Sequence, residues 1–303
     1  MAGKNSAATK SCPSLNIKTV SAIHVAVGIC VFAVMPAKAG TQNNGLGLDS
    51  RRGEVKNITR WSLEHTEHVP TDAASIQMVI LDPDRHAPLS SWPAGCLKLA
   101  SLSVGEAEDS RPYWAKISSA PYLIEQDRDQ EGAVRVDFRD PRWQRLLSEE
   151  EVPRALRQGY QGLLLDHLDS PPYLEQKDPG RFTGNRAALA NWLARLREAY
   201  PSLVLLAKGA DALVTAAPYV DGYVVEGIFT IWDPAAAQAR RSTREERDQA
   251  LDQIGNALAL ASRPVFTIDP VGSGDHPLAA WAIKESKKHG FRPPIQVRQG
   301  SVE

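Results

Sequence analysis

Short apolar runs rich in β-branched residues recur along most of the chain, and each run is typical of a buried strand. Several are bounded by Gly, Asp or Pro, which end strands and begin turns. We expect eight strands, at residues 58–63, 76–81, 97–104, 134–138, 162–165, 203–207, 222–225 and 265–268.

Helical patterns lie between these runs. Asp140 and Pro141 form an N-cap and first helical position, and Ser242 or Thr243 opens a capping box with Glu245 or Glu246. Apolar residues recur at helical spacing over 189–196, and the last helix, at about 278–289, is followed by Gly290. Because strand and helix alternate, the sequence predicts an α/β fold, a (β/α)8 TIM barrel in a single domain.

The first 39 residues have the layout of a secretory signal peptide. Three Lys precede an apolar run over 20–35, and Ala37-Lys38-Ala39 supplies a small-x-small cleavage site, so we place cleavage after Ala39. An uncleaved membrane anchor is the alternative, although the run is short for a membrane span. We predict that residues 40–57 are a flexible tether and that residues 58–303 form the barrel domain. The signal peptide leads us to expect a secreted or periplasmic protein.

Composition narrows the function further. The chain has 303 residues, of which 43% are hydrophobic and 23% charged, which is typical of a globular protein. Residues 1–39 contain four Lys and no acid, so their removal lowers the net charge from −1 to about −5, and such an acidic body does not suit a nucleic-acid partner. The remaining chain keeps only Cys96 and can form no internal disulfide. The sequence contains no metal-ligand spacing and no phosphate-binding loop, so we expect no metal and no cofactor. We also expect the protein to be a monomer.

The connections between the predicted elements differ in length. The links that follow strands are long, whereas the links that precede them are short. In a barrel the long links gather at the C-terminal face, where barrel enzymes build their active sites. The residues at or just beyond the strand ends are mostly acids: Asp82, Glu106, Asp166, Lys208, Glu226 and Asp269. Any one of them could instead be a cap or a solvated loop residue.

Asp166 and Glu226 are the candidate catalytic pair. Asp166 ends a run of three Leu, and Glu226 is the single acid within the apolar run 223–229. Burial there would keep Glu226 protonated, as a general acid requires, while Asp166 stays ionised. An ionised and a protonated carboxyl group are the minimal equipment for cleaving a glycosidic bond. Loop aromatics such as Trp232 could cover the apolar face of a sugar ring, or could simply pack a loop onto the barrel.

The segments 101–114, 136–144, 159–169 and 221–226, in this order, resemble glycoside hydrolase family 114, the endo-α-1,4-polygalactosaminidases. The block Gly105-Glu-Ala-Glu-Asp109 is the most distinctive part. The resemblance implies a barrel that cleaves galactosamine-containing exopolysaccharide without a metal, with Asp166 and Glu226 as its essential acids. It also implies substrate-cleft positions for four further residues: Glu106, Arg111, Tyr113 and Asp169.

Lys208 departs from the family pattern, which leads us to expect a neutral amide at this strand end. Its charge could repel a cationic galactosamine unit, so the natural sugar could be acetylated or different. We count it with Asp82 and Trp232 among the substrate-binding candidates.

Three functions remain open. The leading one is an exported, endo-acting glycoside hydrolase on an amino-sugar polymer. The second is a catalytically silent barrel that only binds polysaccharide. The third is a lyase that uses Lys208 as a Schiff-base nucleophile, although neighbouring acids should raise the pKa of Lys208 and so keep its amine protonated.

Overall fold

The computed structural model describes residues 48–67, 69–128, 130–209, 212–272 and 276–294. The expected signal peptide and the first eight residues of the expected tether therefore lie outside the described residues. All described residues belong to one unit of the fold.

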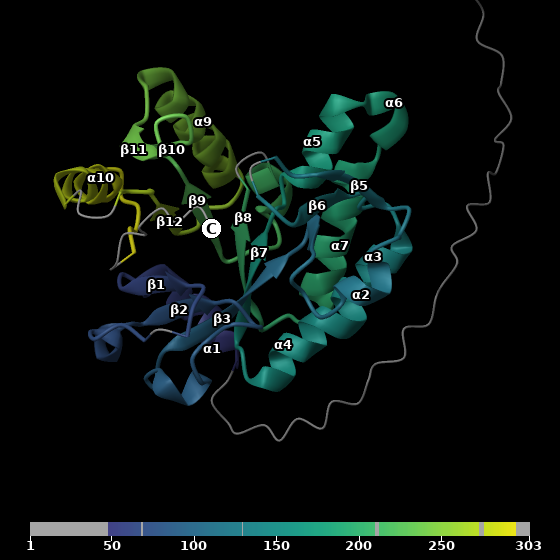
Figure 1. The fold of residues 1–303 in the computed structure, drawn as a ribbon. Helices are drawn as coiled ribbons and strands as arrows, with labels where there is room; N and C mark the ends of the chain where they lie inside the picture. Colours follow the sequence, from purple (N-terminus) through teal and green to yellow (C-terminus); the bar gives the residue numbers. More distant parts are fainter. Residues whose placement is uncertain (1–47, 68, 129, 210–211, 273–275, 295–303) are drawn as a thin grey trace, which may run out of the picture. The chain divides into compact units, whose positions relative to one another are not determined.

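A parallel sheet of seven strands forms the centre of the fold (Figure 1). Its hydrogen-bonded order is β1-β2-β3-β7-β8-β9-β12, and each neighbouring pair is parallel. The strands are β1 (Trp61–Glu64), β2 (Met78–Leu81), β3 (Leu97–Ser103), β7 (Gly162–Asp166), β8 (Val204–Lys208), β9 (Gly222–Glu226) and β12 (Val265–Ile268). The curled, helix-flanked parallel sheet confirms the predicted barrel class.

The predicted strand 134–138 is not part of this sheet, which corrects the count of eight. Residues 133–136 form β6, the middle strand of an antiparallel sheet between β4 (Glu106–Glu108) and β5 (Leu123–Gln126). An apolar run identifies a strand but not its partner, so the sequence could not separate a barrel strand from an accessory one. A two-stranded hairpin, β10 (Thr230–Asp233) with β11 (Gln238–Arg241), follows β9.

The C-terminal segment closes the side of the sheet between β12 and β1. In the described part of the chain no strand ladder joins these two strands. Instead, Arg292 forms a parallel bridge with Phe266 of β12, and its carbonyl oxygen accepts hydrogen bonds from Thr267 N (3.0 Å) and from Trp61 Nε1 of β1 (2.9 Å). A single residue thus connects the two outer strands of the sheet.

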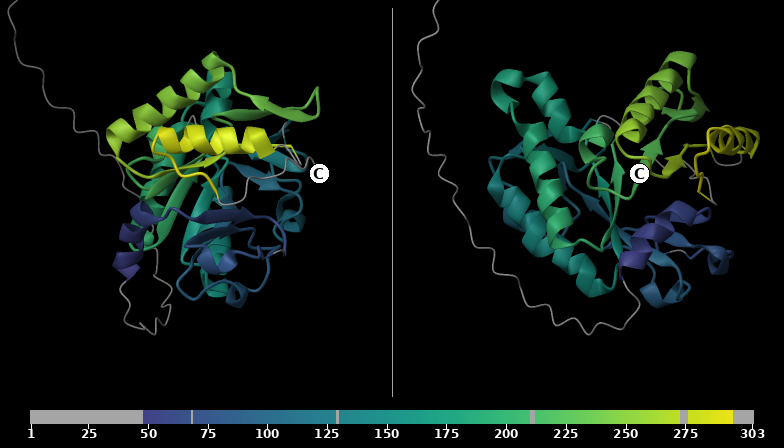
Figure 2. Two further views of the ribbon diagram at one scale, coloured as in Figure 1. Left: turned by 90° about the vertical axis from the view of Figure 1, so that its left-hand side faces the viewer. Right: turned by 180° about the vertical axis from the view of Figure 1, so that it is seen from behind.

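Helices flank the outer side of the sheet (Figure 2). They are α1 (Leu48–Glu54), α2 (Trp114–Ile117), α3 (Pro141–Arg145), α4 (Val152–Gln158), α5 (Ser170–Lys177), α6 (Pro179–Phe182), α7 (Asn185–Ala199), α8 (Leu213–Ala216), α9 (Arg244–Leu260) and α10 (His276–Lys288), with a π-helical turn over Leu146–Glu151 between α3 and α4. The expected caps are confirmed: Asp140 accepts a hydrogen bond from Arg142 N, and Thr243 forms the capping box with Glu246. Only short 3-10 turns, at Ala73–Ser75 and Leu89–Ser91, follow β1 and β2 in the described residues.

The expected tether is wrong for residues 48–57. These residues form α1 and a 3-10 turn, and Val55 is fully buried against the strands. Arg52 of α1 donates to the buried carboxylate of Asp221 (2.8 Å), next to β9. The low apolar content of this segment predicted flexibility. Burial of Val55 and the ion pair between Arg52 and Asp221 instead anchor it to the fold.

Side chains alternate between the two faces of the central strands. One face packs against the helices. The other forms an inner apolar cluster with contributions from all seven strands, including Trp61, Leu164, Leu206, Val224 and Phe266. This inner cluster lies beneath the strand ends that carry the candidate site.

Candidate active site

Three neighbouring strands bring the candidate acids and Lys208 together. Leu164, Leu206 and Val224 belong to the inner cluster, so the side chains two residues further on point to the same side of the sheet. Those residues are Asp166, Lys208 and Glu226, each the last residue of its strand. Period-two alternation therefore aims all three into the open end of the barrel.

Lys208 bridges the two predicted catalytic acids. Its Nζ lies 3.1 Å from Asp166 Oδ2 and 3.2 Å from Glu226 Oε2. Burial alone would lower the pKa of Lys208, but the two carboxylates outweigh burial and raise it, so Lys208 is an ammonium ion. For Asp166, burial favours protonation, but Lys208 and His167 outweigh it and hold its pKa at about 2. Asp166 is therefore ionised at neutral pH.

The expected burial of Glu226 is wrong, because its side chain is 42% exposed. The apolar neighbours Val225, Ile228 and Phe229 are buried, but Glu226 itself projects from the strand end. A linear apolar run does not reveal this, since the alternation of a strand turns adjacent residues in opposite directions. In the free protein Glu226 is held by the ammonium group of Lys208 rather than by an apolar pocket.

Glu106 lies below the surface of the site, with a side chain that is 1% exposed. Ser170 Oγ donates to Glu106 Oε1, and Arg135 Nε lies 3.5 Å from the same oxygen. Burial raises the pKa of Glu106, opposed by the charge of His167 and by the Ser170 hydrogen bond. The expectation that Glu106 lines the cleft directly is therefore corrected, because its side chain is buried beneath the strand ends.

Arg111 and Tyr113 also differ from their expected placement. The guanidinium of Arg111 binds Asp82 (2.5 Å), Asp84 (3.1 Å) and Glu108 (2.6 Å), and its side chain is 12% exposed. Tyr113 is buried edge-on against Trp143, and its hydroxyl accepts a hydrogen bond from Glu108 N (3.1 Å). These groups, with Asp82, form an internal network that fixes the loop after β3 and β4, rather than a set of free ligands.

Asp169 and Trp232 remain candidates for substrate contact. Asp169 immediately precedes α5 and is half-buried, and burial raises its pKa. Trp232 is half-buried in β10, and its indole nitrogen finds no hydrogen-bond partner within the part of the chain that the structure describes.

Two residues near the strand ends, Asp269 and His167, were not chosen as site candidates from the sequence. Asp269, a strand-end acid, accepts hydrogen bonds from Phe229 N (2.7 Å) and Thr230 N (3.0 Å) and so fixes the turn that joins β9 to the Trp232 hairpin. Burial raises its pKa to about 6. His167 directly follows Asp166 and contacts it through the backbone. Adjacency to Asp166 was the only available signal for His167.

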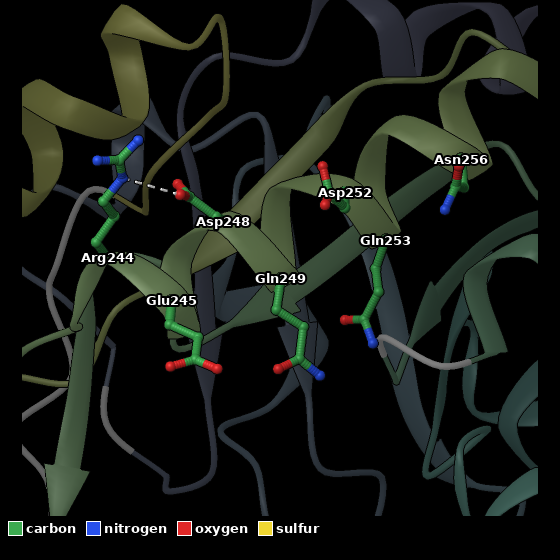
Figure 3. Close-up of a pocket in the computed structure, with 7 residues that line it drawn as sticks. All are labelled: Arg244, Glu245, Asp248, Gln249, Asp252, Gln253 and Asn256. Carbon is green, nitrogen blue, oxygen red and sulfur yellow. Dashed lines mark hydrogen bonds and ion pairs between the residues drawn. The ribbon is translucent and has the colours of Figure 1, made fainter.

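Two surface hollows lie away from these acids. One, of about 640 Å³, follows the polar face of α9, where Figure 3 shows side chains from Arg244 to Asn256. All its lining residues come from this one helix, so it is an open groove rather than a cleft between elements. The other, of about 510 Å³, lies beside α2 and α3. Neither includes Asp166 or Glu226, and the geometry of the three strand ends is the stronger guide to the site.

Within the described ranges, no group of three His, Cys, Asp or Glu side chains is arranged to hold a metal ion. The same ranges contain no helix that is long and apolar enough to cross a membrane.

Known proteins share this fold and sequence pattern. Over residues 49–298 the chain matches the model of glycoside-hydrolase family GH114. A protein of Deinococcus radiodurans is 26% identical over 242 residues, which cover 73% of this chain and 75% of that protein.

Two solved structures are also similar. The glycoside hydrolase domain of PelA from Pseudomonas aeruginosa has a TM-score of 0.65 and 25% identity, covering 78% of this chain and 93% of that one. Ega3 of Aspergillus fumigatus, solved in complex with galactosamine, has a TM-score of 0.51 and 16% identity, covering 73% of this chain and 80% of that one, and it supports the fold alone. Since the family match spans most of the sequence, the chain belongs to glycoside-hydrolase family GH114 and is a glycoside hydrolase.

Proposed function

We propose that this protein is an exported, endo-acting hydrolase of a galactosamine-containing polysaccharide, with Asp166 and Glu226 as its catalytic pair. The observation that carries the proposal is the convergence of both carboxylates on Lys208 Nζ, at 3.1 and 3.2 Å. The substrate class follows the resemblance of the sequence to family 114, and Ega3, which shares the fold, was solved with galactosamine bound. Export is supported by the signal-like residues 1–39.

The separation of the two acids supports a retaining mechanism. Asp166 Oδ2 and Glu226 Oε2 lie 3.1 and 3.2 Å from one nitrogen, so these two oxygens are at most about 6.3 Å apart, which fits the close carboxyl pair of a retaining enzyme. In this mechanism the Asp166 carboxylate attacks the anomeric carbon while Glu226 gives a proton to the leaving oxygen. Glu226 then takes a proton from the water that hydrolyses the covalent glycosyl ester.

Lys208 has a defined part in this cycle. As an ammonium ion it keeps Asp166 ionised for attack, because its charge opposes protonation of that carboxylate. Glu226, ion-paired with Lys208 in the free protein, must take up a proton and leave Lys208 before it can give that proton to the leaving oxygen. Substrate entry between Glu226 and Lys208 would break this ion pair.

The charge of Lys208 does not argue against a cationic sugar. Its single positive charge faces two carboxylates, so the three groups together carry a net negative charge. The repulsion expected from a free lysine is therefore offset, and an unacetylated galactosamine unit remains an acceptable substrate. Asp169 and Trp232 are proposed to contact the same polymer.

The Schiff-base alternative is disfavoured by the same contacts. An amine nucleophile must be neutral, whereas both carboxylates raise the pKa of Lys208. Borohydride reduction in the presence of a carbonyl substrate should leave Lys208 unmodified. A stable adduct on Lys208 would instead support the lyase.

The direct test is incubation of the protein with galactosamine, N-acetylgalactosamine and glucosamine polymers, with the products sized by mass spectrometry. Internal cleavage of a galactosamine-containing polymer by the wild-type protein, and none by Asp166→Asn, is the expected result. Binding of the polymer without cleavage by the wild-type protein would support the silent barrel. Sequencing of the exported form should begin at Gly40, and recovery of intact Met1 in membranes would indicate an anchor.

A further inference from the structure

The backbone of His167 has an unusual conformation. Its φ angle is 54°, and Ala237 is the only other non-glycine residue with a positive φ among those that the structure describes. A bulky residue in this left-handed region is strained and persists only where its surroundings hold it. His167 lies directly after Asp166, so the strain is located at the proposed nucleophile.

This conformation turns the His167 N–H toward Asp166. The N–H donates to Asp166 Oδ1 at 2.7 Å, while Lys208 Nζ donates to Oδ2 at 3.1 Å. Each carboxylate oxygen thus has its own donor, from a different strand end. The rotation of the Asp166 carboxylate is fixed by the pair.

Two glycines enclose the turn that contains His167. A Cβ atom at Gly105 would lie 2.0 Å from the carbonyl oxygen of His167, and one at Gly209 would lie 2.9 Å from Asp169 N. Gly105 follows β3 and Gly209 follows β8, the two strands that flank β7. Close backbone packing on both sides therefore holds the strained turn in place.

The imidazole ring is held by hydrogen bonds at both nitrogens. Nδ1 lies 2.9 Å from Ser103 Oγ, and Nε2 lies 2.9 Å from Gln130 Oε1. The Ser103 hydroxyl already donates its one hydrogen to the carbonyl oxygen of Glu106, so it must accept from Nδ1. The Gln130 carbonyl oxygen can only accept, so Nε2 must also carry a hydrogen. With Gln130 Oε1 as the acceptor, both ring nitrogens carry a hydrogen and the ring is an imidazolium.

A buried carboxylate beside the ring supports this assignment. Glu106 Oε2 is buried, lies 4.0 Å from His167 Nε2, and has no hydrogen-bond partner among the described residues. The charged groups that face the ring are Asp166 of β7, Asp169 just before α5, Glu106 and Glu108 of β4, and Lys208 of β8. Burial opposes a charge on the ring, but the acids outweigh both burial and Lys208 and raise the pKa of His167.

We propose that His167 is a positioning residue that remains doubly protonated and, as a fixed cation between Glu106 and Asp166, holds the Asp166 carboxylate ionised and correctly oriented. The proposal rests on the proposed role of Asp166 in the reaction. It adds a second cation beside Lys208, supplied by an imidazole ring that does not itself touch the reacting atoms, although the backbone N–H of the same residue binds Asp166.

Nuclear magnetic resonance tests the charge of the ring without any substrate. In wild-type protein labelled with ¹⁵N at histidine, His167 should show two protonated ring nitrogens at pH 7 and above. In His167→Asn, the ¹³C-detected titration midpoint of Asp166 should rise from about 2 by at least about one pH unit. The matched control His86→Asn changes a half-buried histidine that lies against Tyr160, and it should leave that midpoint unchanged. A neutral His167 ring at pH 7, or an unchanged Asp166 midpoint, would overturn the proposal.

Kinetics separate the ring from the backbone. Asn tolerates a positive φ, and Gly removes the strain entirely. His167→Asn and His167→Gly should both lower kcat by about 10- to 100-fold with KM nearly unchanged, because both lose the cation. Full turnover in His167→Gly would mean that only the backbone conformation matters, and would refute the role of the ring. If wild-type protein cleaves no polymer, the proposed function fails, whereas the resonance measurements still decide the charge of His167.

Discussion

The inward-facing side chains of the barrel strands are apolar toward one end of the barrel and charged at the other. Toward the N-terminal ends, inward side chains such as Leu164 and Leu206 are fully buried and apolar, and Trp61 packs edge-on against Phe266 at 5.4 Å. Two residues further along the same strands, the inward positions carry Asp166 and Lys208. The strand sets the direction of each side chain, and access to solvent decides whether that position can hold a charge. One end therefore supplies stability, and the other carries the charged groups proposed to act in catalysis.

The largest expected effect is at the charged end. Asp166→Asn and Glu226→Gln should each lower turnover by at least about 10²- to 10⁴-fold, since each removes a carboxyl group that is proposed to act in the transition state. Polymer affinity and the unfolding midpoint should change little, as measured by calorimetry and circular dichroism. Asp248→Asn, on the open groove of α9, is the matched control and should keep full turnover. Wild-type turnover in Glu226→Gln would refute the assignment of the pair.

Substitutions at the apolar end should lower stability and leave turnover nearly unchanged. Phe266→Ala should lower the free energy of unfolding by about 3–5 kcal/mol, because it leaves a cavity in the inner cluster and removes the contact with Trp61. Turnover per folded molecule should remain close to wild type. Urea unfolding with Leu260→Ala, a substitution at a 62% exposed position, provides the control and should show almost no change. Loss of turnover without loss of stability in Phe266→Ala would break the division between the two ends.

Two acids near the charged end should give opposite dependences of stability on pH. The pKa of Asp269 rises from 3.8 to about 6 on folding, so its contribution to stability is present below pH 3.8 and is lost as the pH rises to about 6. The pKa of Asp166 falls to about 2, so its contribution is present above pH 3.8 and is lost as the pH falls toward 2. Relative to wild type, Asp269→Asn should gain stability between pH 4 and 6 by urea unfolding. The absence of this gain would mean that Asp269 ionises freely in the folded protein.

Substitutions of Lys208 test whether its charge controls the ionisation of Asp166. Lys208→Met removes the charge that lowers the pKa of Asp166, so the acid limb of the activity profile should move to higher pH. Lys208→Arg keeps the charge and should leave that limb near its wild-type position. Identical profiles for Lys208→Met and wild type would show that the ion pair does not control Asp166.

The smallest effect concerns Cys96, which is buried with its pKa raised to about 11 by burial. It is the one cysteine outside the expected signal peptide. Reductant should therefore leave the melting temperature unchanged in a thermal scan. A shift of several degrees would indicate an intermolecular disulfide.

The sequence by itself determined the strands that build the barrel and the acids at their ends. Apolar runs, caps at Asp140 and Thr243, and the acids after the strands are local features, and local propensity and alternation specify them directly. Asp166 and Glu226 were found in this way, because parallel strands bring their C-terminal ends to one face.

Only the tertiary structure decided which groups meet. The strand at Ala133–Val136 joins an accessory sheet, Arg292 closes the barrel, and Arg111 and Glu106 lie inside networks instead of facing the cleft. Burial and charge at these positions depend on partners far apart in the chain, such as Lys208 for Asp166 and Gln130 for His167. The electric field that sets the protonation of the site is a sum over such partners, and no short stretch of sequence contains it.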